Sequence, residues 1–202
     1  MGEVPSSDNV TSAEDQQERL LSAAWIVGFV DGEGCFSVPI NRNVSMKLGW
    51  QVQPTFAVTQ GESSRDVLEA MVTYFGCGAV FRNGRNDNHK EDLLRYVVTK
   101  QDDLHRVIVP FFEQNPLRTS KRANFDKFVQ VLHLMAQRRH LSVNGLMEIA
   151  AIVETMNHRK PSAVLRILRD HTPTLFLSSE EEEDMVRALR RRRESGGNDQ
   201  TR

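Results

Sequence analysis

Two carboxylates, Asp31 and Glu33, stand at the end of an apolar run, and their type and position suggest a cation site. The run from Ala23 to Val30 carries no charge, and Gly34 directly follows the second acid. The C-terminal end of a helix carries partial negative charge and normally prefers cations. Two carboxylates there are unfavourable unless a metal ion or another cation lies nearby. Hard divalent cations such as Mg²⁺ prefer oxygen ligands, so the pair is a plausible metal site.

Three small residues, Ala24, Gly28 and Gly32, precede and accompany the acids at four-residue spacing. Residues four apart share one face of a helix, so the three form a stripe with almost no side chain. Such a stripe lets a second helix approach closely, and a close-packed pair would bring two acidic ends together. We therefore predict a dimer interface along this stripe. The alternative is an ordinary buried helix that ends at a glycine and carries two incidental acids.

The stretch from Val27 to Gly34, read Val-Gly-Phe-Val-Asp-Gly-Glu-Gly, resembles the motif of the LAGLIDADG homing endonucleases. The resemblance puts Glu33 at the family's metal-binding acid position. It makes the Gly34 carbonyl a further possible ligand and Asp31 a second, less direct choice. It also implies DNA phosphodiester hydrolysis with Mg²⁺ or another hard divalent cation. The chain holds one such motif and no repeat of it, so the resemblance implies a homodimer.

The same resemblance suggests further catalytic residues. Gln60 ends the run Val-Thr-Gln, where the family uses a glutamine to orient active-site water; an ordinary surface glutamine is the alternative. Lys121 lies in a basic loop at a position where the family places a residue that organises solvent or stabilises phosphate. Arg118 competes with Lys121 for this role, and Arg65 falls near another basic position of the family. The choice among these three basic residues stays open.

The order of predicted elements is helix, two strands, helix, two strands, helix, which indicates an α+β fold. The periodicities predict helices at about 13–31, 64–75, 102–113 and 120–139, and strands at 35–41, 49–60, 79–82 and 94–99. The resemblance covers about residues 20–135 and implies the αββαββα fold, with a saddle-shaped antiparallel sheet on the DNA major groove. Two extra C-terminal helices are expected at 144–157 and 162–170. We expect one domain over 12–175, between a disordered tail at 1–11 and a charged tail at 176–202.

One face of the predicted hairpin over 35–41 and 49–60 carries amide and hydroxyl side chains, and the other is apolar. Amide side chains pair bidentately with adenine, and hydroxyls contact several bases. Arginines of the second strand pair and its loop would add base or phosphate contacts. The alternative is a solvated sheet face. The expected DNA-binding residues are Ser37, Asn41, Gln51, Gln53, Thr55, Thr59, Arg82, Arg85 and Arg95.

The charge distribution is compatible with DNA binding, although the net charge is −1. Residues 19–179 hold 20 Lys and Arg against 15 Asp and Glu, a balance of +5, and acidic terminal segments mask it. No apolar run is long enough to span a bilayer, and no secretory signal is visible. Cys35 and Cys77 lack metal-ligand spacing and are expected to be reduced thiols in an intracellular protein. The arginines at 190–193 are more simply a solvated tail than a DNA-backbone or targeting element.

The leading interpretation is a site-specific, metal-dependent endonuclease, free-standing or intron-encoded, whose partners are double-stranded DNA and a second copy of the chain. One alternative is non-enzymatic: an intron maturase that binds host intron RNA, or a non-cleaving DNA-binding regulator of the same fold. A third is an oligomeric scaffold, which leaves the amide-rich strand face and the acidic helix end unexplained. We predict no membrane partner.

Overall fold

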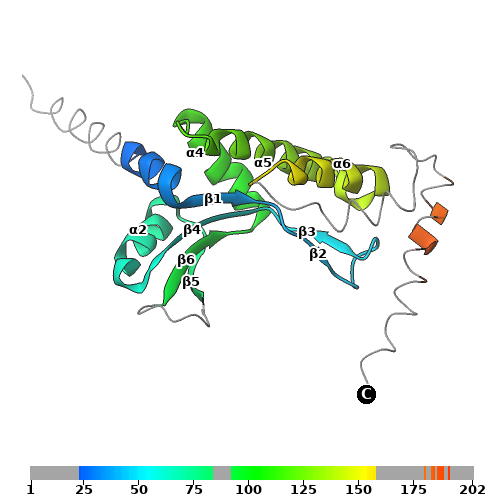
Figure 1. The fold of residues 1–202 in the computed structure, drawn as a ribbon, viewed down its shortest axis with the longest axis horizontal. Helices are drawn as coiled ribbons and strands as arrows, with labels where there is room; N and C mark the ends of the chain where they lie inside the picture. Colours follow the sequence, from blue (N-terminus) through cyan, green and yellow to red (C-terminus); the bar gives the residue numbers. More distant parts are fainter. Residues whose placement is uncertain are drawn as a thin grey trace, which may run out of the picture.

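The computed structural model describes residues 23–83 and 92–157, together with residues 180, 183, 184, 186–188 and 191 (Figure 1). A helix over residues 23–33, here called the motif helix, opens the described chain. The elements that follow are β1 (Gly34–Ser37), β2 (Ile40–Arg42), β3 (Trp50–Val52), β4 (Thr55–Gly61), η2 (Glu62–Ser64), α2 (Arg65–Phe75), β5 (Ala79–Asn83), β6 (Leu93–Val98), α3 (Gln101–Asp103), η3 (Leu104–Ile108), α4 (Val109–Gln114), α5 (Lys121–Ala136), η4 (Arg139–Leu141) and α6 (Val143–Glu154). This confirms the predicted α+β order.

The strands form a four-stranded antiparallel sheet in the order β1-β4-β6-β5, and β2 and β3 form a separate two-stranded sheet. Ser37 pairs with Thr55, and Ile40 pairs with Val52, so one register runs through both sheets. The predicted hairpin between 35–41 and 49–60 therefore forms, but each of its two long strands is interrupted once.

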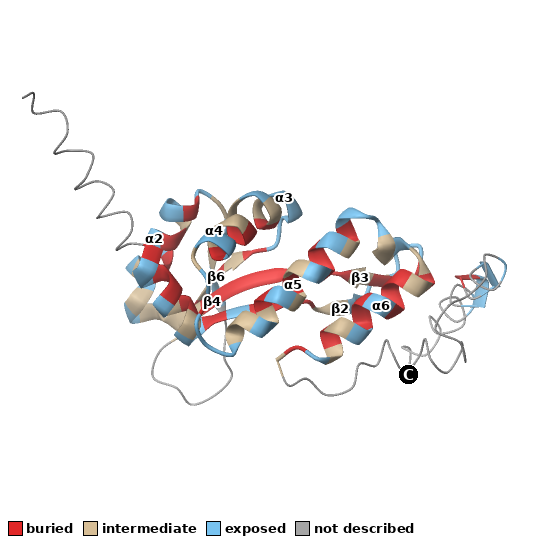
Figure 2. Cartoon of the chain, turned by 90° about the horizontal axis from the view of Figure 1, so that it is seen from above, coloured by how far each residue is buried: buried red, intermediate tan, exposed pale blue. Residues whose placement is uncertain are grey.

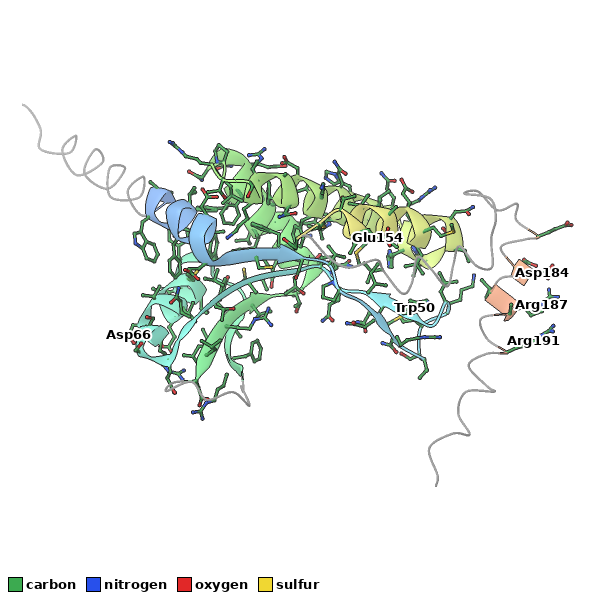
Figure 3. The ribbon with its side chains drawn as sticks, viewed as in Figure 1. Trp50, Asp66, Glu154, Asp184, Arg187 and Arg191 are labelled. Atoms are coloured by element: carbon green, nitrogen blue, oxygen red, sulfur yellow. The ribbon has the colours of Figure 1, made fainter. Side chains whose placement is uncertain are left out.

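Two prolines cause these breaks. Pro39 and Pro54 fall between the paired segments, and proline has no N–H to contribute to a ladder. Only Pro54 was expected to weaken its strand. One ladder bond survives in the gap, where the Gln53 N–H donates to the Pro39 carbonyl at 3.0 Å. The hairpin β2–β3 thereby stays attached to the main sheet as an extension, with Trp50 far from Asp66 on α2 (Figure 3).

Helices cover one face of the main sheet. α2 packs on β4, β5 and β6, and α5 packs on β1. Figure 1 shows α4, α5 and α6 along one side, while no described helix covers the opposite face between β5–β6 and the hairpin. In Figure 2 the buried positions gather where helices and strands meet. The aromatic centre of this core consists of Phe36, Phe56, Phe112, Phe125 and Phe128.

Several local predictions agree closely with the structure. α2 ends at Gly76, whose φ of 63° is left-handed and whose N–H donates to the Val72 carbonyl, a common helix stop. Tyr96 and Val98 are buried, as the alternation in their strand predicted. The helix predicted at 102–113 spans residues 101–114, with a π-helical middle at Leu104–Ile108. None of the described helices has the length and apolar character needed to cross a lipid bilayer.

The C-terminal predictions are met in part. α6 forms where a helix was predicted at 144–157, and Asn157 just beyond it donates through Nδ2 to the Phe36 carbonyl at 2.8 Å. This contact fixes the end of α6 on β1. The helix predicted at 162–170 lies outside the described residues. Val186, in the predicted charged tail, is 8% exposed and belongs to the core cluster.

Candidate active site and DNA-facing sheet

The motif helix ends at Glu33, and the chain passes directly into β1 at Gly34. A Cβ atom at Gly34 would lie 2.5 Å from Val30 Cγ1 and 2.8 Å from the Val30 carbonyl oxygen. Only glycine fits such a close approach of strand to helix. The glycine therefore sets the sharp exit that leaves the acidic helix end at the edge of the sheet.

Asp31 binds the loop before α5. Its Oδ2 accepts from the Arg118 N–H at 2.8 Å, and its Oδ1 accepts from the Thr119 hydroxyl at 2.8 Å and the Thr119 N–H at 3.3 Å. Thr119 Oγ1 in turn accepts from the Lys121 N–H at 3.2 Å. A carboxylate at the N-terminal end of α5 is also favourable for the helix dipole. Asp31 thus caps α5 from a distant part of the sequence.

Lys121 completes a reciprocal contact between the two helices. Its Nζ donates to the Val30 carbonyl at 2.8 Å and to the Gly32 carbonyl at 3.1 Å, so it caps the motif helix. The first turn of α5 therefore supplies the cation that the acidic helix end requires. A metal or another cation was expected there, and Lys121 supplies a cation from within the chain.

These contacts shift the pKa values of both groups. Partial burial works to raise the pKa of Asp31, but the hydrogen bonds from Arg118 and Thr119, with the charge of Lys121, outweigh it and hold it below 3.8. Burial lowers the pKa of Lys121, against the electrostatic influence of Cys35, Asp31 and Glu33. Thr119 was not predicted as a site residue, although a threonine beside a helix start is a known capping signal.

Glu33 differs from Asp31 in having a free carboxylate. Its side chain is exposed and makes no hydrogen bond or ion pair with the described part of the chain. Among residues 23–83 and 92–157, no group of three or more His, Cys, Asp or Glu gathers in metal-binding geometry. Of the two acids at this helix end, Glu33 is the one whose oxygens are available to an external ligand.

The predicted dimer stripe faces open space. Ala24, Gly28 and Gly32 are exposed, and Cβ atoms built at the two glycines meet nothing within 4 Å. Beside them Trp25 is 51% exposed and stacks on Phe29, with 5.0 Å between the ring centroids. This exposed tryptophan was not predicted as an interface residue. The free face of the motif helix is therefore flat along its glycines and bordered by aromatic rings.

The structure places the other three predicted catalytic residues differently relative to the end of the motif helix. Gln60 follows Val58, which pairs with Gly34, so the end of β4 approaches the end of the motif helix. Arg118 reaches Asp31 through its backbone, and its side chain is exposed. Arg65 forms exposed ion pairs with Glu62 and Glu69 along α2, and no described contact joins it to the motif helix.

The uncovered sheet face can be read from the strand register. Thr59 on β4 pairs with Arg95 on β6, which pairs with Phe81 on β5, so these side chains form a row on the same face. Phe81 is 57% exposed and was not predicted as a site residue. Its exposure on a strand is visible only once the register is known.

Three of the expected DNA-binding residues lie where contact with bases is less favourable. Arg82 pairs with Leu94, a buried residue, so it projects from the helix-covered side of β5, where it forms ion pairs with Asp92 and Glu62. Ser37 and Thr55 are each 8% exposed, because they face each other where the main sheet meets the hairpin. The register turns only Arg82 away from the uncovered face; Ser37 and Thr55 lie on the same face as Thr59, and their burial alone leaves them little accessible to bases. Arg85 lies outside the described residues.

The outer hairpin keeps the amide-rich face that the sequence predicted. Asn41 pairs with Gln51, and both project on the opposite side from the buried Trp50 and Val52. Asn41 and Gln53 are exposed, and Gln51 is half-buried. The polar face that is accessible to a ligand is therefore concentrated on β2–β3 and its junction with β4.

The Asp31 contacts lead to a stability prediction. Replacing Asp31 with Ala should lower the free energy of unfolding by about 1–2 kcal/mol at neutral pH, because two backbone N–H groups and a hydroxyl lose an ionised acceptor. Since the folded pKa is depressed, this contribution is present above pH 3.8 and is lost as the pH falls through the folded pKa. Urea unfolding of wild type and variant from pH 7 to pH 3 measures the difference.

Asp126→Ala is the matched control for this measurement, because the contact that Asp126 on α5 makes within the described part of the chain is an exposed ion pair with Arg122. Its loss should cost roughly 0.5 kcal/mol. An Asp31 effect no larger than that of Asp126, or one that does not shrink in acid, would remove the structural role assigned to the carboxylate.

Comparisons with known proteins agree with this architecture. A family model described as LAGLIDADG endonuclease matches residues 26–132. A crystal structure of the homing endonuclease I-TnaI is 38% identical with a TM-score of 0.66, over 73% of this chain and 96% of that chain. I-SmaMI bound to cleaved DNA is 29% identical with a TM-score of 0.67, over 75% of this chain and 49% of that chain.

Curated relatives give the same result. "Probable intron-encoded endonuclease 3" of Neurospora crassa is 34% identical over 134 residues, which is 66% of this chain and 24% of that protein. The chain thus spans about a quarter of the length of the first curated relatives it matches.

Proposed function

Because the chain belongs to the LAGLIDADG endonuclease family, we propose that it is a site-specific, metal-dependent endonuclease that cleaves double-stranded DNA. It would act as a homodimer on a long, nearly palindromic target inside the cell. I-SmaMI has been seen bound to cleaved DNA, and also to uncleaved DNA in the presence of calcium ions. These relatives support the substrate class and the use of a divalent cation.

One observation supports this proposal above the others: a free carboxylate, Glu33, ends a helix whose glycine face is open. Two copies packed along Gly28 and Gly32 would bring two such carboxylates together. A non-cleaving regulator would need the dimer but not the free acid. The pairing of a free acid with an open helix face therefore favours cleavage.

The donor set fits a hard divalent cation. Glu33 of each copy would hold the metal, and DNA phosphate oxygens would complete the oxygen ligands; the Gly34 carbonyl stays a predicted ligand. The bound metal would supply an activated water and stabilise the leaving oxygen. Lys121 uses two of its three N–H donors on the helix carbonyls, which leaves one for a phosphate oxygen or water. Asp31, whose oxygens already accept from Arg118 and Thr119, stays the second choice as a ligand.

The remaining predicted site residues would orient water, contact phosphate or read bases. Gln60 would orient water at the end of β4, and Lys121 is favoured over Arg118 and Arg65 as the basic residue of the centre. Asn41, Gln51, Gln53, Thr59 and Arg95 would read bases from the uncovered face. A maturase that binds host intron RNA remains the alternative, distinguished by its lack of metal-dependent DNA cutting.

The proposal is tested by incubating the purified chain with duplex DNA from the uninterrupted allele of a candidate host gene, with and without Mg²⁺. A double-strand cut at one mapped position, dependent on Mg²⁺, is the expected result. Binding without cutting under both conditions would support the non-cleaving alternative. Tight binding to intron RNA with no DNA binding would support the maturase.

Gln53 gives a prediction about specificity. Its side chain is exposed at the junction between the two sheets, with its backbone held by the bond to Pro39. Replacing Gln53 with Ala should relax selectivity at a symmetric pair of base positions, at a cost of roughly 1–3 kcal/mol for a good contact. Deep sequencing of cleaved targets measures the effect. An unchanged profile at every position would remove Gln53 from base readout.

A further inference from the structure

The turn that closes the hairpin β2–β3 holds a short relay of side-chain hydrogen bonds. Asn43 Oδ1 accepts from the Ser45 N–H at 3.0 Å and from the Ser45 hydroxyl at 2.7 Å. Asn43 Nδ2 then donates to Gln51 Oε1 at 2.9 Å. Since Asn41 pairs with Gln51, Asn43 is the diagonal neighbour of Gln51 on the same face. The relay connects the turn to a predicted base-reading side chain.

The chemistry of the donors fixes the direction of every bond in this relay. A backbone N–H can only donate, so the Asn43 atom that faces Ser45 must be the oxygen. The other end of Asn43 is then its amino group, which also can only donate. The Gln51 atom that meets it must therefore be the carbonyl oxygen. The main chain of the turn thus determines which end of the Gln51 amide takes no part in the relay, and that end is the Nε2 amino group.

Three backbone hydrogen bonds stabilise the turn itself. The Asn43 N–H donates to the Gly49 carbonyl at 3.0 Å, the Met46 N–H donates to the Asn43 carbonyl at 3.1 Å, and the Gly49 N–H donates to the Met46 carbonyl at 2.9 Å. Gly49 has a φ of 74°, a left-handed conformation that other residues rarely adopt. These bonds hold the Ser45 N–H in position, so the relay starts from a rigid point.

We propose that Asn43 is a positioning residue for DNA specificity, which makes Gln51 present its Nε2 donor to the bases. This inference rests on the proposed function. In the major groove, purine N7, guanine O6 and thymine O4 are acceptors, whereas cytosine presents only its N4 amino donor. Gln51 therefore favours a base that offers an acceptor and discriminates against cytosine on the contacted strand. Asn43 acts through Gln51 without touching the base.

An isosteric substitution tests the direction of the relay. In Asn43→Asp, one carboxylate oxygen keeps both bonds from Ser45, and the other oxygen replaces the amino group that faces Gln51. The Gln51 amide then turns its Nε2 toward the new acceptor and presents Oε1 to the DNA. The preference at that base position should move toward bases with an amino group, cytosine above all. A change of shape is avoided, because Asn and Asp have the same heavy-atom outline.

The matched control is Val44→Asp. Val44 is 62% exposed in the same turn and has no part in the relay, so this variant adds the same charge without reversing an amide. The added carboxylate should weaken binding about equally for all sequences, because it repels phosphate. Thermal unfolding of both variants verifies that each is folded.

The experiment selects bound duplexes from a randomised DNA library with the full chain, in buffer without divalent metal so that the duplexes stay intact. At one symmetric pair of positions, Asn43→Asp should raise the ratio of cytosine to guanine by roughly tenfold over wild type, while Val44→Asp leaves that ratio unchanged. Gln51→Ala identifies the positions that Gln51 reads.

Each contrary outcome points to a different error. If Asn43→Asp keeps the wild-type base preference at the position where Gln51→Ala changes it, the relay does not determine which base Gln51 prefers. If Val44→Asp produces the same shift, the cause is charge and the inference is wrong. If Gln51→Ala changes no position, Gln51 reads no base and the inference is overturned. If wild type enriches no sequence at all, the proposed DNA recognition fails and this inference fails with it.

Discussion

Replacing Glu33 with Gln is expected to abolish strand cutting while DNA binding is retained or slightly strengthened. The amide keeps the shape of the side chain but lacks the charge that a hard divalent cation requires. Losing that ligand removes several kcal/mol of transition-state stabilisation, so the cutting rate should fall by about 10³-fold or more. Binding should persist, because removal of a carboxylate lowers repulsion with phosphate. Fold stability should change little, since the exposed Glu33 side chain has no hydrogen-bond partner among the described residues.

Cutting and binding should be measured on one preparation with the mapped target, beside a Glu148→Gln control. Glu148 is an exposed acid on α6 whose partner among the described residues is Arg139, so its variant removes the same charge away from the motif helix. If Glu33→Gln cuts at nearly the wild-type rate, Glu33 is not the ligand and Asp31 becomes the candidate. If the variant neither cuts nor binds while folded, Glu33 is structural and the endonuclease proposal loses its main support.

The fold was largely predictable because its signals are local. Alternation over 94–99 predicted which side chains of β6 are buried, and helical spacing with Gly76 predicted where α2 ends. The strand breaks at Pro39 and Pro54 follow from a local rule that the prediction applied to one proline only. The side of the sheet from which Arg82 projects was harder to predict, because alternation within a five-residue strand does not indicate which side the helices cover.

The candidate site was predictable only in part, because its contacts connect distant segments. Helix electrostatics correctly demanded a cation at the acidic helix end, but Lys121 lies 91 residues from Val30, whose carbonyl it binds. A sequence pattern cannot show that this lysine completes the helix. The difference between the two acids depends on the same loop, since Arg118 and Thr119 donate to both oxygens of Asp31, whereas Glu33 has no hydrogen-bond partner among the described residues.

Replacing Gly28 with Leu should abolish both dimerisation and cleavage while the fold of each chain persists. A Cβ at Gly28 meets nothing within 4 Å in the single chain, so the new side chain projects into space that only a partner would occupy. In a close-packed pair of helices, overpacking costs roughly 1–3 kcal/mol at each copy, so the pair loses roughly 2–6 kcal/mol and the dimer becomes at least about thirtyfold weaker. Cleavage should be lost with the dimer, because in the proposed homodimer each copy would contribute half of the centre.

Sedimentation of both proteins at micromolar concentration, with cleavage measured on the same samples, tests this expectation. Ala70→Leu on α2 is the matched control, because Ala70 is also an exposed small residue on a helix but lies outside the motif helix. The control should remain dimeric and active. Both variants should still unfold cooperatively, and Gly28→Leu should lack the stabilisation that dimer formation gives wild type. Wild type that sediments as a monomer yet cuts DNA would contradict the dimer. A Gly28→Leu protein that still pairs and cuts would place the interface on another face, because no close helix contact could accommodate two added leucines.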